Sequence, residues 1–342
     1  MLLGCGNVGG ELLDQIQRQA DNLIEHHVDL RVRAIANSEK LLIADDKLDL
    51  ASWQEELSES GAAWSMDDVI AIRKNLGLLS PTIVDCSTDE GLAAEYVKLL
   101  DAGFNIVAAN KKANTADYTY YEEMRAAEKR NFRKFLYETN VAAGLPFIDT
   151  LQSLIRSGDE LRTFEGILSG SLSMIFGLLE DGVPLSSAVS RAMELGFTEP
   201  DPRDDLSGMD VARKLLIIAR EVGLRLELDD IEVEPVVPWD VVGHVDRADL
   251  IDTLETLDES IAARIADAAE QDAVLRYVGR VEDGKCKVSI EAVERSKPLG
   301  AIRDGENALV IHTAYYQPIP MVLRGYGAGA AVTAAGVFGD LL

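Results

Sequence analysis

The sequence predicts an α/β protein in which a doubly wound parallel sheet is joined to a second, mixed α+β domain. A glycine-rich turn near the start of the chain, followed by a helix and a strand, predicts the first β-α-β unit. Short apolar strands and amphipathic helices then alternate to about residue 138, which is the rhythm of a parallel sheet. Beyond Pro146 the pattern changes, and two alternating strands with Asp283-Gly284 between them indicate a hairpin.

These patterns divide the chain into three segments. We expect residues 1–145 to form a dinucleotide-binding domain, in which residues 39–80 contribute two amphipathic helices, and residues 146–318 to form a substrate-binding and catalytic domain. Residues 319–342 contain another glycine-rich helix start, and we expect them to return to the dinucleotide-binding domain. The alternative for this last segment is close helix–sheet packing by small residues.

Residues 4–9 read G-C-G-N-V-G, which is the G-x-G-x-x-G turn of Rossmann-type sheets. The motif is common, but here it lies between a strand at 1–3 and a helical pattern, with a second strand at 30–36. Glycine lets backbone N–H groups approach a pyrophosphate, and the helix N-terminus favours its negative charge. Gly4, Gly6 and Gly9 are therefore candidate cofactor-binding residues. Because the first strand is short, we expect the natural polypeptide to begin further upstream.

The choice of cofactor depends on the residues directly after the second strand. This strand ends in Ala36-Asn37-Ser38, with Lys40 nearby, and lacks the acid that binds the ribose 2′-hydroxyl of NAD. Neutral side chains and a lysine leave room for a 2′-phosphate. The sequence therefore favours NADP, although use of NAD is also compatible with it. The alternative is that Lys40 is an ordinary surface lysine.

Polar residues come after three further predicted strands, at 82–86, 105–109 and 132–138. In open α/β sheets, ligands bind beyond the carboxyl ends of the strands. The three ends read Ser87-Thr88, Asn110-Lys111-Lys112 and Glu138-Thr139-Asn140. The place of Lys111 therefore favours a functional role over that of a solvated loop lysine.

The stretch from Gly196 to Lys214 concentrates acidic and basic residues. Two prolines predict a stiff extended loop in its first half, and the pattern then predicts a helix from about 206 to 222. Asp210 and Lys214 are four residues apart on this helix, so their side chains meet. They form either an exposed ion pair, worth about 0.3–0.5 kcal/mol, or a catalytic face. The residues expected to face the core share helical spacing: Val211, Leu215, Ile218 and Val222.

The composition argues against several classes of function. The chain has 342 residues, 47% of them hydrophobic, and a net charge of −26, which repels phosphate backbones and argues against a nucleic-acid partner. No apolar run reaches the ~20 residues of a membrane span and no signal peptide opens the sequence, so we expect a cytoplasmic protein without membrane contact. Three scattered cysteines fit reduced thiols, and the four histidines form no zinc-binding pattern.

Five blocks of sequence carry a resemblance to a known family: residues 109–113 (ANKKA), 138–146 (ETNVAAGLP), 166–173 (GILSGSLS), 199–214 (EPDPRDDLSGMDVARK) and 327–337 (GAGAAVTAAGV). They occur in the order found in homoserine dehydrogenases, and the chain resembles that family over essentially its whole length. The resemblance implies a Rossmann-type domain with a substrate and dimerisation domain. It also implies the NAD(P)H-dependent interconversion of L-aspartate 4-semialdehyde and L-homoserine, a step toward threonine and methionine.

The resemblance further implies roles for individual residues. Lys214 matches the proton donor, and Lys111 matches a lysine between substrate and nicotinamide that also contacts the cofactor. Glu199 and Asp210 match substrate-binding acids, with Asp205 a further candidate. The matched nucleotide contacts are Asn7, Val8, Ser87, Thr88, Gly196 and Gly327. A site for Na⁺ or K⁺, which suit hard oxygen ligands, is matched by Glu138 and by the main-chain carbonyls of Val141, Ala143 and Leu145.

The resemblance also bears on assembly, and two other functions stay open. It implies a homodimer, and either the short form of the family, without a C-terminal regulatory ACT domain, or the dehydrogenase half of a bifunctional aspartokinase–homoserine dehydrogenase. In one alternative function, Cys86 at a strand end is the nucleophile of another NAD(P)-dependent aldehyde dehydrogenase. In the other, the chain senses a nucleotide without turnover.

Overall fold

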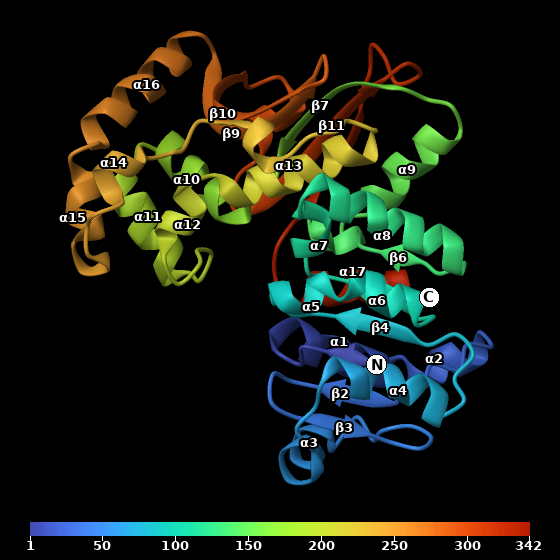
Figure 1. Ribbon diagram of the computed structural model, residues 1–342. Helices are drawn as coiled ribbons and strands as arrows, with labels where there is room; N and C mark the ends of the chain where they lie inside the picture. Colours follow the sequence, from blue (N-terminus) through green and yellow to red (C-terminus); the bar gives the residue numbers. More distant parts are fainter. The chain divides into compact units, whose positions relative to one another are not determined.

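The computed structural model describes all 342 residues and divides them into two compact units, drawn in Figure 1. The first unit contains Met1–Gly144 and Gly329–Leu342, and the second contains Leu145–Ala328. The last helix therefore belongs to the unit in which the chain begins. Strand β12 (Met321–Tyr326), in contrast, lies in the sheet of the second unit. The segment 319–342, expected to return as one piece, is thus divided between the units.

The first unit is built on a six-stranded sheet with the strand order β3-β2-β1-β4-β5-β6. Strand β1 pairs in parallel with both β2 and β4, so the chain extends the sheet first on one side of β1 and later on the other. Such a reversal creates a switch point at the carboxyl ends of the strands, where doubly wound sheets bind ligands. The strands are β1 (Leu2–Leu3), β2 (Ala34–Ala36), β3 (Leu41–Ile43), β4 (Thr82–Asp85), β5 (Asn105–Ala108) and β6 (Phe135–Leu136).

The predicted doubly wound sheet is confirmed, with one antiparallel edge that the sequence prediction lacks. Strand β3 pairs antiparallel with β2 in a region where only helices are expected. Residues 37–40 connect the two strands, and so short a connection makes a hairpin because a parallel crossover needs a dozen or more residues. Asn37 closes the turn, since its Oδ1 accepts hydrogen bonds of 2.8 and 2.7 Å from the backbone N–H groups of Glu39 and Lys40.

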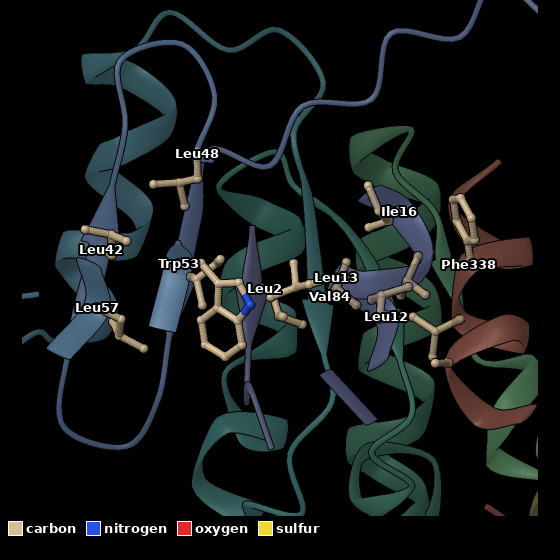
Figure 2. Packing of buried hydrophobic residues seen from close by; sticks show 14 of the residues in the cluster. Leu2, Leu12, Leu13, Ile16, Leu42, Leu48, Trp53, Leu57, Val84 and Phe338 are labelled. Atoms are coloured by element: carbon tan, nitrogen blue, oxygen red, sulfur yellow. The ribbon is translucent and has the colours of Figure 1, made fainter. Parts of the chain in front are cut away.

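The two ends of the chain share one hydrophobic core. Helix α1 (Asn7–Arg18) packs against α17 (Ala330–Leu341), and Figure 2 shows Leu12 and Ile16 of α1 beside Phe338 of α17. Leu2 of β1 and Val84 of β4 belong to the same buried cluster, so removal of this apolar surface from water stabilises strands and helices together. The other helices of the unit are α2 (Ala20–Glu25), α3 (Trp53–Ser60), α4 (Met66–Asn75), α5 (Glu90–Ala94), α6 (Tyr96–Asp101), α7 (Lys112–Thr115) and α8 (Tyr118–Asn131).

The second unit is the expected mixed α+β domain. Its sheet has the order β12-β11-β7-β9-β10-β8, in which every pair is antiparallel except β8 with β10. The long hairpin of β9 and β10 contains the predicted Asp283-Gly284 turn. The strands are β7 (Leu161–Ile167), β8 (Glu232–Val233), β9 (Ala273–Glu282), β10 (Lys285–Glu294), β11 (Glu306–Thr313) and β12.

Helices α10 and α13 pack against strand β9. Of the four predicted core-facing residues, Val211, Leu215 and Ile218 of α13 are buried, and Gly279 of β9 lies in contact with the first two. Val222 is only half-buried, because it caps the carboxyl end of the helix. None of the helices in either unit combines the length and the apolar composition that a membrane crossing requires. The helices of the second unit are α9 (Ile148–Arg156), α10 (Gly170–Glu180), α11 (Leu185–Glu194), α12 (Pro202–Leu206), α13 (Met209–Glu221), α14 (Trp239–Val242), α15 (Leu250–Glu255) and α16 (Asp258–Glu270).

The extended loop predicted before α13 is wrong in part, because α12 lies within it. Pro202 stands at the first position of α12, where its missing N–H would have no partner and its fixed φ suits a helix. Asp201 caps the helix, since its Oδ1 accepts a hydrogen bond from the backbone N–H of Arg203. Pro202 therefore disfavours helix in the residues before it and is itself the first residue of a helix.

Candidate functional site

The ammonium group of Lys214, near the start of α13, is held by two oxygen atoms. Nζ lies 2.8 Å from Oδ2 of Asp210, one helical turn earlier, and donates a 2.6 Å hydrogen bond to the carbonyl of Leu168. Lys214 is 8% exposed, whereas the Asp210 side chain is 44% exposed. The pair is therefore anchored in the interior at its lysine end and is not an ordinary solvated ion pair. Burial of an ammonium is costly unless oxygen partners replace its hydration.

Asp205, on α12, links the loop at Glu199 to the start of α10. Its Oδ1 accepts a 2.5 Å hydrogen bond from Ser171 Oγ, and its Oδ2 accepts a 2.8 Å bond from the backbone N–H of Glu199. Ser171 Oγ also lies 2.9 Å from Ser169 Oγ, which caps α10 by accepting a bond from the N–H of Leu172. This chain of hydrogen bonds fixes the loop against the helix start.

Asp205 lies in a partly buried, acidic environment. Burial raises the pKa of Asp205 above its ordinary value, and the negative charges of Glu199 and Asp210 act in the same direction. The hydrogen bonds from Ser171 and from the N–H of Glu199 oppose this rise. A positive charge beside these acids would reduce the repulsion between them. The protonated amino group of a ligand would carry such a charge.

The glycine turn of the first unit has the close packing that a nucleotide-binding turn requires. Gly4 adopts a φ of +89°, and a Cβ added to it would lie 2.8 Å from the backbone N of Ser87. A Cβ added to Gly9 would lie 2.1 Å from the carbonyl oxygen of Gly4. Helix α1 begins directly after the turn, at Asn7 and Val8, and no side chain caps its N-terminus. Such a helix start favours a bound phosphate.

The other predicted residues of the first unit lie at the carboxyl ends of β4 and β5. The backbone N–H of Ser87 donates a 2.7 Å hydrogen bond to Oδ1 of Asp85, and Thr88 is exposed. Lys111 is half-buried and stands at the N-cap of α7. Because β4 and β5 are parallel neighbours, both loops meet the same edge of the sheet, together with the glycine turn.

Two predicted nucleotide contacts belong to the second unit. Gly196 comes after α11 with a φ of +73° and open space around it. Gly327 lies directly against Asn307 of β11, and a Cβ added to it would lie 2.0 Å from Asn307 Nδ2. Close packing thus explains glycine at position 327. Nucleotide contacts at both positions stay predictions.

Three of the predicted cation ligands lie in one loop of the first unit. Glu138 is 8% exposed, and Val141 and Ala143 come after it within the loop. Ala142 and Ala143 both adopt positive φ, of 57° and 50°. This conformation is uncommon outside glycine and persists only where the surroundings enforce it, which is frequent at functional turns.

The fourth predicted cation ligand, Leu145, is the first residue of the second unit. Its carbonyl oxygen accepts a 2.8 Å hydrogen bond from the N–H of Phe147. The structure contains no group of three His, Cys, Asp or Glu side chains that would hold a metal ion. A cation at Glu138 would therefore depend on main-chain carbonyl oxygens, which are ligands that Na⁺ and K⁺ accept.

Two residues in these clusters are absent from the sequence prediction. Ser171 bonds Asp205, although in the sequence it reads only as part of a turn into a helix. Asp85 lies beneath the loop after β4, although it reads as part of an apolar strand. A usable signal existed for Asp85, because a charge at the end of a buried strand needs partners.

The two units together define a class of protein. A Rossmann-type sheet with a glycine turn at its ligand edge is typical of dinucleotide-binding proteins, and the second unit adds a mixed α+β domain in which a buried lysine is paired with Asp210. Residues 4–138 match the family model described as the NAD binding domain of homoserine dehydrogenase, and residues 146–342 match the model of homoserine dehydrogenase. The chain belongs to the homoserine dehydrogenase family.

Individual proteins are similar to this chain over its whole length. A bifunctional aspartokinase/homoserine dehydrogenase of Haemophilus influenzae is 51% identical over 341 residues, which cover 100% of this chain and 42% of that protein. A crystal structure of a Candida auris protein of unknown function has a TM-score of 0.90 and 31% identity, covering 100% of this chain and 95% of the other. A hyperthermophilic archaeal homoserine dehydrogenase in complex with NADPH shares the fold, with a TM-score of 0.75, 23% identity, and coverage of 99% and 95%. The chain spans 42% of the length of the first curated relatives it matches.

The start of helix α13 generates a prediction about stability. Gly208 has a φ of 74°, and a Cβ added to it would lie 1.9 Å from Tyr277 Oη, which donates a 2.7 Å hydrogen bond to the carbonyl of Glu234. Gly208→Ala should therefore lower the free energy of unfolding by about 1–2 kcal/mol, because alanine is strained in the left-handed backbone conformation. The clash with Tyr277 should add about 1–3 kcal/mol. Urea unfolding measures the sum.

Gly223→Ala is the matched control at the other end of the same helix. Gly223 has a φ of +87°, but nothing lies within 4 Å of an added Cβ. In this variant the free energy of unfolding should fall only by the backbone contribution of about 1–2 kcal/mol. Equal losses in the two variants would show that Tyr277 does not constrain the start of α13.

Proposed function

We propose that this chain catalyses the NAD(P)H-dependent, reversible reduction of L-aspartate 4-semialdehyde to L-homoserine, a step toward threonine and methionine. The observation that carries the proposal is the buried ammonium of Lys214, held by Asp210 and by the carbonyl of Leu168. Membership of the homoserine dehydrogenase family supports the same activity.

Lys214 is the proposed proton donor. Reduction of an aldehyde needs a hydride at the carbonyl carbon and a proton at the carbonyl oxygen, and the nicotinamide cofactor supplies the hydride when it is bound. Asp210 and the Leu168 carbonyl fix the position of the Lys214 ammonium, so protonation of the alkoxide requires little rearrangement of the protein. In the reverse direction the neutral amine accepts the hydroxyl proton of homoserine. Lys111 is proposed to lie between substrate and nicotinamide, where its charge would stabilise the developing alkoxide.

The acids of the second unit are the proposed site for the substrate amino group. Glu199, Asp205 and Asp210 are the candidates, and the hydrogen bond from the Glu199 N–H to Asp205 ties two of them together. An ammonium group bound there would favour the ionised form of Asp205, whose pKa burial raises. Binding of the substrate and ionisation of this carboxyl would therefore support each other.

The two alternative functions, a dehydrogenase with a cysteine nucleophile and a nucleotide sensor, have less support. Burial raises the pKa of Cys86 to about 12, and the charge of Asp85 acts in the same direction. A thiol with that pKa is almost wholly protonated at neutral pH, whereas the nucleophile in such enzymes is the thiolate. Family membership likewise favours the dehydrogenase over an aldehyde dehydrogenase with a cysteine nucleophile and over a nucleotide sensor.

The first unit belongs to an NAD-binding domain family, and we propose NADP as its preferred cofactor. The loop after β2 supports this choice, because it has no acid at Asn37 or Ser38 to repel a 2′-phosphate. The ammonium of Lys40 donates to the carbonyl of Ser58, so it also serves the local structure of the loop. A homoserine dehydrogenase of the same fold forms a complex with NADPH, which supports the proposal by likeness.

Homoserine with each oxidised cofactor in turn tests the function and the cofactor together. We expect absorbance of the reduced nicotinamide to appear with L-homoserine and NADP, with a kcat/KM for NADP at least equal to that for NAD. D-homoserine and L-threonine are suitable control substrates. No turnover with either cofactor would contradict the proposed function, and a strong preference for NAD would contradict only the cofactor assignment.

Replacement of Lys214 tests the proton donor. Lys214→Ala should reduce kcat with homoserine by about 10²–10⁴, the usual contribution of a positioned acid or base. Binding of NADPH should change little, because the nucleotide-binding turn lies in the first unit. Lys287→Ala, which removes an exposed lysine paired with Glu232 in the same unit, should retain wild-type kcat. Near wild-type kcat in Lys214→Ala would transfer the role to Lys111.

A monovalent cation, Na⁺ or K⁺, is a further part of the proposal. The buried carboxylate of Glu138 and the left-handed turn at Ala142 and Ala143 support it, together with the carbonyls of Val141, Ala143 and Leu145 as proposed ligands. The loop from Glu138 leads to the boundary between the two units, so a cation there would fix the course of the chain at this point. Its proposed effect is on structure, without a part in the chemical step.

Replacement of Glu138 tests the cation. Wild-type activity should rise when Na⁺ or K⁺ replaces choline at constant ionic strength, and Glu138→Ala should abolish this response. Glu123→Ala, an exposed position on α8 in the same unit, should keep it. An unchanged cation response in Glu138→Ala would exclude this site.

The wider assembly is also a proposal. Curated relatives that match the whole of this chain are named bifunctional aspartokinase/homoserine dehydrogenases, which supports a protein in which an aspartokinase accompanies this dehydrogenase. The resemblance to the family supports a homodimer.

A further inference from the structure

We infer that Asp85 is a positioning residue for the proposed reaction, because its buried carboxylate fastens the loop after β4 to the loop after β5. The inference rests on the proposed function, since these loops carry the proposed nucleotide contacts Ser87 and Thr88 and the proposed catalytic Lys111. Asp85 is the last residue of β4 and is 0% exposed. A carboxylate in such a place needs partners, and its partners here come from separate elements.

The carboxylate of Asp85 accepts three hydrogen bonds. Oδ1 accepts a 2.7 Å bond from the backbone N–H of Ser87. Oδ2 accepts a 2.6 Å bond from Tyr96 Oη on α6 and a 3.0 Å bond from Asn110 Nδ2 after β5. Burial and the charge of Asp85 hold the pKa of Tyr96 well above its ordinary value, so the phenol keeps its proton and stays a donor. Three donors around one carboxylate fix its orientation.

Asn110 connects Asp85 to the loop after β5, which contains Lys111. Its Nδ2 donates a second bond, of 2.8 Å, to the carbonyl of Asp89, and its Oδ1 accepts a 3.0 Å bond from the backbone N–H of Lys112. The bond to Lys112 closes a turn around Lys111. Because the amide nitrogen faces two acceptors and the amide oxygen faces a donor, a flipped amide would lose all three bonds. The backbone of Lys111 is therefore located relative to Asp85.

Ser87 transmits the same constraint to the glycine turn. Its backbone N–H is fixed by Asp85, and its Oγ accepts a 3.2 Å hydrogen bond from the N–H of Asp89. The Ser87 backbone also packs against Gly4, where an added Cβ would lie 2.8 Å from the Ser87 nitrogen. One carboxylate thus fixes the loops after β4 and β5 directly, and it supports the nucleotide turn through Ser87.

Asparagine at position 85 would have nearly the same size but could not replace the carboxylate. Its amide nitrogen would face either the N–H of Ser87 or the donors Tyr96 and Asn110, and a donor would then meet a donor. Asp85→Asn therefore tests the hydrogen-bond pattern with little change in packing volume. Tyr96→Phe is a milder test, because it removes one donor and leaves the other two bonds to the carboxylate.

The expected effect falls on the cofactor and on the chemical step. Asp85→Asn should weaken NADPH binding and reduce kcat by roughly a hundredfold, the loss that a misplacement of about 1 Å produces. The KM for homoserine should stay near the wild-type value, because the proposed substrate acids lie in the second unit. Tyr96→Phe should show a smaller loss with the same split between cofactor and substrate.

Two matched variants separate positioning from general destabilisation. Tyr120→Phe also removes a phenol hydroxyl of the first unit, one that lies beside Tyr96 but donates its 2.6 Å bond to the carbonyl of Ala93 and makes no hydrogen bond to Asp85. Ile83→Val weakens the packing of β4 two residues before Asp85. Both should lower the melting temperature while kcat and the Kd for NADPH stay at wild-type values.

The kinetics of these variants decide the inference. Wild-type kcat and NADPH affinity in Asp85→Asn would overturn it, as would equal kinetic losses in the control variants. If Asp85→Asn fails to fold, the comparison of Tyr96→Phe with Tyr120→Phe decides in its place. An inactive wild-type chain would contradict the proposed function instead, and NADPH fluorescence titration of the same variants would still test the role of Asp85.

Discussion

The burial of one ammonium group, that of Lys214, constrains how a strand and a helix of the second unit can pack. A charged amine removed from water is stable only where oxygen atoms replace its hydration. Asp210 supplies one oxygen from the same helix, and Leu168 supplies the other from the residue directly after β7. The end of β7 and helix α13 must therefore stay at a fixed distance for the charge of Lys214 to remain paired. Gly208 and Gly279 permit that arrangement, because the first starts α13 with positive φ and the second lets it lie close to β9.

In the first unit, the main constraint is on several loops at the edge of the sheet. Loops are ordinarily the mobile parts of a fold. Here buried polar side chains lie beneath them, such as Asp85 at the end of β4. A second set involves Asn140, whose Nδ2 donates a 2.8 Å bond to the carbonyl of Ala108 and whose Oδ1 accepts a 2.9 Å bond from Asn114. Fully satisfied networks of this kind make a site rigid before any ligand arrives.

The parts of the fold that sequence reasoning predicted depend on local patterns. The glycine turn before α1, the apolar stripe of α13 and the turn between β9 and β10 each arise from residues close together in the chain. The hairpin strand β3 is not predicted because three residues carry too little periodicity to separate a strand from a helix. Helix α12 is not predicted because Pro202 suppresses helix in the residues before it, and that effect hides the helix it starts.

The sequence by itself determined that Asp210 and Lys214 meet, because a spacing of four residues places two side chains on the same face of a helix. It also determined that the turn at Gly4 leads into a helix with an open N-terminus. Only the tertiary structure decided that Lys214 is buried and bonded to Leu168, 46 residues earlier. The same holds for Ser171 with Asp205, 34 residues apart, and for Asp85 with Asn110, 25 apart. The physical reason is that helical spacing acts over one turn of the chain, whereas burial and hydrogen bonds between distant residues exist only after strands and helices have packed.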